Sequence, residues 1–276
     1  MALKNSYVTP AEFLLWVTTQ DVTADTNDDL VIEAILEDVS RYIDSFTGRK
    51  FYPRVDTRYY DKPEDRELIF DDELLSLTTL TNGNDVAIAS TEYNLLPKNN
   101  SPYEGLRMIA SSSIAWESDS NSNTEYVIDV LGEWGYHGDY TDHGWTLGGT
   151  LGAAISDTTT LAFTATAGHS LVAGQIIKIG SEIQIINTVV TNTITPLARG
   201  DNGSTAATHD NATSVYIWNP QPEIVQAAKL IAQSVYRRFG SKQAEENIVT
   251  ASGVIITPRD IPGLAARTLH LYSRIT

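Results

Sequence analysis

The chain has no cysteine among its 276 residues, which excludes a disulfide framework and a thiolate metal site. Basic residues are also scarce, because 19 lysines and arginines stand against 35 acidic residues and give a formal net charge of -16. That balance disfavours open, strong contact with a phosphate backbone. No apolar run is long enough for a membrane span or a signal-peptide core. We therefore expect a soluble, cytoplasmically made protein with no membrane partner.

What is present favours a folded chain. Apolar residues make up 42% of the sequence, aromatic residues make up 9%, and there are 18 glycines. This composition is typical of globular proteins, and the length allows one or two domains.

The acidity does not exclude DNA as a neighbour, because the wall of a channel through which a duplex slides is expected to repel it.

Two long segments have the apolar spacing of amphipathic helices. One runs up to Gly48, where a left-handed glycine is expected to end it, and the other runs from Pro220 to Gly240. A shorter helix is predicted over residues 11–18. The stripe of the first long helix consists of Ile32, Ile35, Val39, Tyr42 and Phe46.

Residues 52–136 change to short β-type runs separated by turn residues, among them a hairpin signal at Asn82-Gly83. Residues 151–215 hold only four acids and two bases and are rich in threonine and glycine, which indicates a compact all-β module. We predict an α+β fold, in which a helical bundle frames a small antiparallel sheet. The predicted division is a core at 1–144, an inserted all-β module at 145–218, and the rest of the core at 219–276.

The sequence offers little for catalysis. Its glycine-rich stretches lack the ending of a phosphate-binding loop, and no nucleophile elbow occurs. Two loops contain grouped metal-ligand types, but no regular element of the predicted fold fixes them in place. We therefore predict a non-enzyme without metal or cofactor. The two loops contain His137, Asp139, Asp142 and His143 in one, and Asp201, Asn202 and Asp210 in the other.

Cations and aromatic residues alternate directly after the first long helix. They fit either a nucleic-acid patch or the two faces of a strand whose cations neutralise nearby acids. The net charge favours the strand interpretation. The residues are Arg49, Lys50, Arg54 and Arg58, with Phe51, Tyr52, Tyr59 and Tyr60.

The order of segments resembles the head-tail connector, or adaptor, proteins of long-tailed, siphovirus-like bacteriophages. The resemblance covers about residues 7–137 and 220–276. It is carried by "YVTPAEFLLWV", "LVIEAILEDVSRYIDSFTGRKFYPR", "TRYYD", "LLSLTTLTNGNDVAI", "STEYNLLPKNNSPYEGLRM", "VIDVLGEWGY" and "PEIVQAAKLIAQSVYRRFG". In this family, "TGRKFYP" corresponds to the junction where the long helix passes into the β part.

The predicted insert is similar to a small β module of phage and virus structural proteins. That module has an Arg-Gly-x-Asn-Gly-Ser/Thr-x-Ala-x-x-His turn. Connectors pass from the "WGY" strand to the last long helix by a short loop, so about 80 residues depart from the family pattern. The matching positions are Arg199, Gly200, Asn202, Gly203, Ser204 and His209.

The resemblance implies a virion structural protein of the head-tail neck, assembled in the host cytoplasm. Its copies are expected to form a ring, typically a dodecamer, that binds the portal protein and a stopper or tail-completion protein. The ring would continue the DNA channel, and double-stranded DNA would pass without sequence-specific contact. The C-terminal tail is expected to dock on the portal and to become ordered only on assembly.

Three sets of residues follow as site hypotheses. The predicted portal-docking tail comprises Arg259, Ile261, Leu264, Arg267, Leu269, Leu271, Tyr272 and Arg274. The stripe of the first long helix, Ile32, Ile35, Val39, Tyr42 and Phe46, is assigned to the core or to a subunit interface. Glu33, Glu37 and Asp44 are assigned to an acidic face toward the channel or solvent.

Other interpretations stay open at this stage. The chain is alternatively another neck or tail protein, such as a stopper, a tail terminator or a decoration protein. A second alternative is a carbohydrate-binding module that uses exposed Trp145, Tyr216 or Trp218. A third is a metal-dependent enzyme built on His137 and His143.

Overall fold

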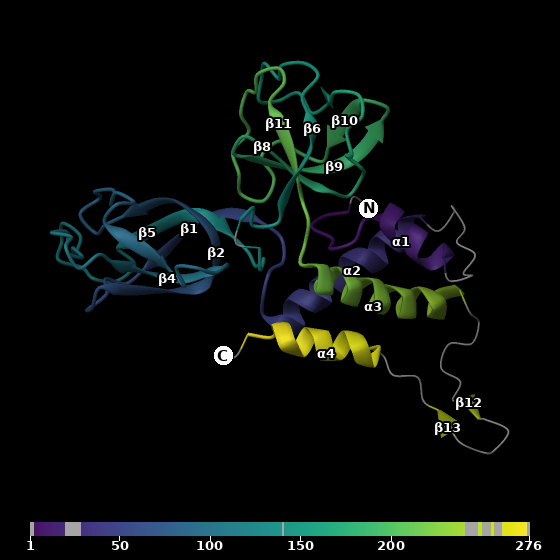
Figure 1. Ribbon diagram of the computed structural model, residues 1–276, viewed down its shortest axis with the longest axis horizontal. Helices are drawn as coiled ribbons and strands as arrows, with labels where there is room; N and C mark the ends of the chain where they lie inside the picture. The colour runs from purple at the N-terminus through teal and green to yellow at the C-terminus, as the bar shows by residue number, and fades with distance from the viewer. Residues whose placement is uncertain are drawn as a thin grey trace.

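Three lobes meet near the middle of the molecule in Figure 1, which shows a first β-sheet, a second β-sheet and a layer of helices. The computed structural model describes residues 3–19, 29–139, 141–240, 248–249, 255–256 and 261–274. Both termini lie on the side of the helices (Figure 1). No helix within these ranges is long and apolar enough to cross a membrane.

The helical lobe contains α1 (Pro10–Thr18), α2 (Asp29–Thr47), α3 (Pro222–Gly240) and α4 (Gly263–Tyr272). Helix α1 begins with a capping box, because the Thr9 hydroxyl accepts from Glu12 N while the Glu12 carboxylate accepts from Thr9 N. Helix α2 ends as predicted at Gly48, whose φ of +68° lies in the left-handed region. Helix α4 was not predicted.

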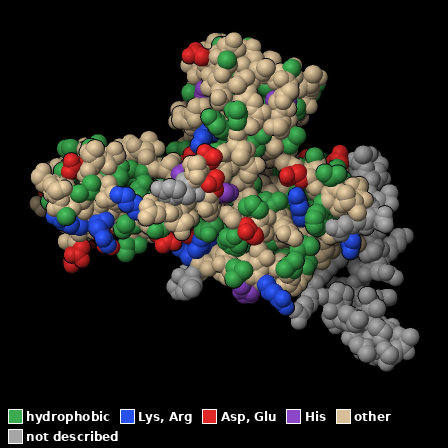
Figure 2. Space-filling view, viewed as in Figure 1, with side chains coloured by type: hydrophobic (Ala, Val, Ile, Leu, Met, Phe, Trp, Pro, Cys, Tyr) green, Lys and Arg blue, Asp and Glu red, His purple; other side chains and the backbone are tan. Residues whose placement is uncertain are grey.

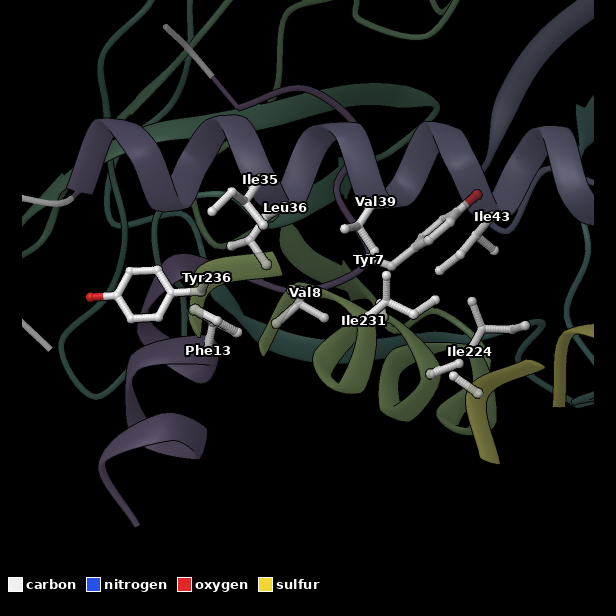
Figure 3. Close-up of a cluster of buried hydrophobic side chains, with 14 of the residues drawn as sticks. Tyr7, Val8, Phe13, Ile35, Leu36, Val39, Ile43, Ile224, Ile231 and Tyr236 are labelled. Carbon is white, nitrogen blue, oxygen red and sulfur yellow. The ribbon is translucent and has the colours of Figure 1, made fainter. Parts of the chain in front are cut away.

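The helices share one apolar core, part of which is drawn in Figure 3. Ile35 and Val39 of α2 lie toward Ile231 of α3, and the N-terminal segment contributes Tyr7 and Val8 (Figure 3). Helix α4 closes the core with Ala265 and Leu269. This packing orders the N-terminal segment and the C-terminal helix against the same two long helices.

The first sheet is antiparallel with the order β1-β5-β2-β4-β3. The long strand β2 shifts register between Ile69 and Leu74, and three acids stand at that irregularity. Trp134 is fully buried in this sheet's core, in edge-to-face contact with Phe70. The strands are β1 (Arg54–Tyr60), β2 (Glu67–Thr81), β3 (Tyr93–Leu96), β4 (Tyr103–Met108) and β5 (Ile128–Trp134).

The second sheet has the order β6-β11-β8-β9-β10-β7. Its first and last strands in chain order are neighbours, with Trp145 paired opposite Trp218. In Figure 2 few charged side chains lie on the lobe that this sheet forms, as its composition implies. The strands are β6 (Trp145–Thr150), β7 (Phe163–Thr164), β8 (Ile176–Ile179), β9 (Glu182–Val190), β10 (Thr193–Pro196) and β11 (Ser214–Trp218), and a separate hairpin contains β12 (Ile248–Val249) and β13 (Ile255–Ile256).

The predicted fold class is wrong. In the part of the chain that the structure describes, 11 strands form two antiparallel sheets and only four helices accompany them, so β-structure dominates. Helical periodicity is the strongest local signal in this sequence and led us to overestimate the helices' share. The sheets depend on pairing between distant segments, which a sequence pattern indicates only weakly.

Specific hydrogen bonds join the second sheet to the other two lobes. The Trp218 indole donates to the carbonyl of Phe51 at 2.9 Å, and Asn202 Nδ2 donates to Asn5 Oδ1 at 2.8 Å and to Pro53 O at 2.9 Å. The carbonyl of Asn202 accepts from Val55 N, at the free edge of β1. Residues 51–55 therefore lie where the helices, the first sheet and the second sheet meet.

Candidate interaction surfaces

The predicted docking tail is an ordered helix packed on the helical core. Leu269 is fully buried, and the Tyr272 ring makes edge-to-face contacts with Phe51 and Tyr136. Arg274 N donates to Thr47 O at 2.8 Å. The expectation that the tail is ordered only on assembly is therefore wrong for residues 261–274, because its apolar side is satisfied within the chain.

The tail residues thus divide into two sets. Ile261, Leu269 and Tyr272 face the core, and the Arg274 guanidinium donates to the carbonyl of Asp71. Leu264, Arg267 and Leu271 are exposed and remain available to a partner. Arg259 lies outside the described residues.

The stripe of α2 is mostly core. Ile32, Ile35 and Val39 are buried, and Phe46 is half-buried against the His270 ring of α4, with centroids 5.0 Å apart. Tyr42 is 37% exposed and stands at the edge of the core. One face of α2 is therefore buried in the core, and the edge of that face at Tyr42 is exposed to solvent.

The predicted acidic face is wrong at Asp44, which is 3% exposed. Its Oδ1 accepts a hydrogen bond from the Tyr7 hydroxyl, and Lys50 Nζ lies 3.2 Å from Oδ2. Burial raises the pKa of Asp44, while the bond from Tyr7 and the charges of Arg41 and Lys50 oppose that rise. Asp44 thus fixes the N-terminal segment on α2. Glu33 and Glu37 are half-buried on the same helix.

An apolar groove lies between α2 and α3. Its volume is about 550 Å³, and it is lined by Leu30, Val31, Ala34, Ile35, Asp38, Val39, Tyr42, Ile231, Val235 and Ile261. Leu30 is 67% exposed and Val31 is 39% exposed, although both begin an otherwise well-packed helix. Such a grouped exposure of apolar side chains marks interaction surfaces on folded proteins. Leu30 precedes the predicted stripe, and periodicity alone gave no sign that it borders a groove.

The arginines after α2 are paired with the acids at the β2 irregularity, whereas Lys50 is paired with Asp44. Arg58 binds Asp71 and Asp72 and stacks over Trp134 at 4.6 Å, while Arg54 binds Asp72. In Figure 2 basic and acidic side chains accordingly lie close together on the lobe of the first sheet. These contacts favour the strand interpretation over a nucleic-acid patch. The neutralising acids are those of β2, whereas we expected Asp61, Glu64 and Asp65.

Glu73 is the most buried acid of this set. It is 2% exposed, lies 3.5 Å from Arg49, and its Oε2 has no hydrogen-bond partner among the described residues. Burial raises its pKa to about 7, against the opposing effect of Arg49 and with a further rise from Asp72. The sequence shows three adjacent acids here but not which one is buried.

The two loops with metal-ligand types make other contacts. His137 Nδ1 accepts from Asp139 N at 3.0 Å, and His143 Nδ1 lies 3.2 Å from Ser101 Oγ. Burial lowers the pKa of both imidazoles. Asp201 Oδ2 accepts from Ile185 N. Within the described ranges, no group of three or more metal-ligating side chains is arranged to hold an ion.

The aromatic residues proposed for carbohydrate binding are mainly structural. Trp145 and Trp218 are 6% and 3% exposed, and only Tyr216, at 39%, is open. The Trp145 indole donates to Glu133 Oε1 at 2.6 Å, and the Lys178 ammonium lies 4.2 Å above the Trp145 ring. The expectation of exposed tryptophans is wrong, because both rings join the second sheet to its neighbours.

A buried ionic cluster holds the turn that resembles the viral β module. Glu182 is fully buried, and its oxygens accept from Arg199 at 2.7 and 2.9 Å and from His209 Nε2 at 2.8 Å. Gly200 N and Ala207 N also donate to this carboxylate. The Arg and His positions of the motif thus bind one acid on β9, which sequence reasoning did not identify as their partner.

A comparison with protein-family models and with curated proteins finds no match for this chain.

Proposed function

We propose that this chain is a virion structural protein, a head-tail connector whose copies form a ring beneath the portal and join the head to the tail. The resemblance of its segments to connectors supports the proposal. The observation that carries it is the apolar groove of about 550 Å³ between α2 and α3, with exposed Leu30, Val31 and Tyr42 at its border. A surface of this kind suits a protein partner better than a small polar substrate.

Assembly would act through burial of apolar surface. Complete burial of one exposed leucine or valine contributes about 1.5 to 3 kcal/mol. Several such side chains in each contact, repeated around a ring, offset the entropy of fixing the subunits. The function would therefore be mechanical, since the ring holds a passage open and connects two parts of the particle.

DNA would pass through this ring without being gripped. The net charge of -16 gives the subunit a field that repels phosphate, which limits retention of a moving duplex. Glu33 and Glu37 of α2 remain the acids that we assign to the channel or solvent side. Portal and stopper or tail-completion protein would bind the two ends of the ring.

The experiment is negative-stain imaging of the purified chain, alone and mixed with the portal protein of the same phage, together with antibody labelling of intact particles. We expect an added ring below the portal and label at the single vertex where the tail joins. A chain that stays monomeric with portal, or labels the shell or the tail tip, is not a connector.

A further inference from the structure

Helix α4 carries an exposed apolar stripe. Leu264 is 58% exposed and Leu271 is 84% exposed, and they lie seven residues apart, which places them on one flank of the helix. Arg267, also exposed, lies between them along the sequence. We define the α4 stripe as these three residues. The helix is held in place by Ala265 and Leu269, so its conformation does not depend on what covers the stripe.

The groove between α2 and α3 complements this stripe. Its border is apolar at Leu30, Val31 and Tyr42, and it contains one acid, Asp38. Asp38 and Arg267 are both exposed, and no ion pair between described residues involves either of them. An apolar groove with a single carboxylate matches an apolar stripe with a single guanidinium in apolar character and in charge.

The α4 stripe cannot enter the groove of its own chain. The ring contact between His270 and Phe46 turns the His270 flank of α4 toward α2. At 3.6 residues per turn, Leu264 and Leu271 lie roughly 100 to 120° around the helix axis from His270. The two leucines of the stripe therefore do not point toward α2, and the groove requires an apolar stripe from elsewhere.

We propose that the α4 stripe of one copy binds in the α2–α3 groove of the next copy, with Arg267 paired to Asp38. This inference rests on the proposed function and names its self-contact. Because the groove of α2 and α3 and the stripe of α4 are two different surfaces of the molecule, the contact is heterologous and leaves a free groove and a free stripe after each addition. Such a contact generates a ring when the rotation closes.

The test uses two charge reversals in the full-length chain, Asp38→Arg and Arg267→Asp. Each leaves like charges facing each other across the contact, so each variant alone is expected to lose assembly and to run at the 30.3 kDa of one subunit by light scattering. Both positions are exposed, so far-UV circular dichroism and thermal midpoint should stay at wild-type values. Masses are measured with and without the portal protein.

An equal mixture of the two variants is the decisive sample. A groove that carries the Asp38→Arg substitution then meets a stripe that carries the Arg267→Asp substitution, so opposite charges face each other again with their signs exchanged. The second pairing in the mixture is that of the wild type, and alternating copies should therefore regain the wild-type mass. Asp65→Arg makes the same charge change at an exposed position between β1 and β2 and should assemble normally.

Three results would reject the inference. If the wild type forms rings and both single variants do so equally well, the groove and stripe are not the self-contact, while the proposed function stands. The same conclusion follows if the single variants assemble normally but no longer bind the portal, because the stripe then binds the portal and not the next copy. If the wild type forms no ring with or without portal, the inference and the proposed function fall together.

Discussion

The Trp218 indole donates a 2.9 Å hydrogen bond to the main-chain carbonyl of Phe51, across 167 residues of sequence. This contact joins the end of the second sheet to the junction that follows α2. Phe51 is itself fully buried, and its ring contacts Tyr7, Tyr136 and Tyr272. The junction is thus a packed meeting point of all three lobes and not a linker.

Replacement of Trp218 by phenylalanine should destabilise the protein by about 1 to 3 kcal/mol, because the buried Phe51 carbonyl loses its donor. The measurement is the free energy of unfolding in urea, followed by far-UV circular dichroism. Tyr216→Phe, on the same strand but 39% exposed, is the control and should change the value by less than about 0.5 kcal/mol. Equal effects of the two substitutions would contradict the assignment.

Glu182→Gln should cost about 3 kcal/mol at pH 7, because it leaves Arg199 buried without a charged partner. Burial alone would raise the pKa of Glu182, but bonds from Arg199, His209 and Ala207 N lower it to about 2. A lowered carboxyl pKa gives stability that is complete above about pH 4.5 and is lost as pH falls toward 2. The gap between wild type and variant should therefore shrink below pH 4.5. A gap that is constant from pH 7 to pH 3 would refute this account.

Gly203→Ala should loosen the second sheet from the first. Gly203 has a φ of +79°, and an added Cβ would collide with the Val55 carbonyl on β1. Gly168→Ala is the matched control, since Gly168 has a φ of +86° but open space around the added carbon. Both variants share the cost of left-handed backbone, and the packing clash should add about 1 to 3 kcal/mol at position 203 alone. Limited proteolysis and urea unfolding should both rank the two variants in this order.

Glu73→Gln should change the pH dependence of stability in the opposite direction from Glu182→Gln. Because the folded pKa of Glu73 is raised to about 7, the wild type binds a proton more tightly when folded and loses this contribution as pH rises from about 4.5 through 7. The variant does not titrate there. Relative to wild type, it should gain on the order of 1 kcal/mol between pH 5 and pH 8. Urea midpoints at the two pH values measure the change, and an unchanged difference would disprove it.

Helical spacing in the sequence was enough to predict which apolar side chains of α2 are buried and where this helix ends. The burial of Ile35 and Val39 and the stop at Gly48 follow from helical spacing and glycine geometry, and the structure confirms them. Asp44 occupies a polar position of the same helix, yet it is buried because Tyr7, 37 residues earlier, supplies a donor. The sequence of α2 does not predict that Tyr7 is the partner of Asp44.

Helix α4 was not predicted from the sequence, because its stability depends on contacts with distant segments. Its ten residues include Arg267 and His270 between leucines, which read as an irregular tail, and a helix of that length is marginal by itself. The helix exists because Ala265 and Leu269 complete a core formed by distant segments. The groove and the relation of the α4 stripe to it also depend on how distant helices pack, so a local sequence pattern does not predict them.

The pairing of Trp145 with Trp218 means that the polypeptide leaves the helical and first-sheet body and returns to it at nearly the same point. A shorter or unrelated segment spliced between these two positions would leave the path of the remaining chain unchanged. The second sheet is thus a side loop in the path of the chain, and the hydrogen bonds of Trp218 and Asn202 fix its orientation on the rest of the molecule.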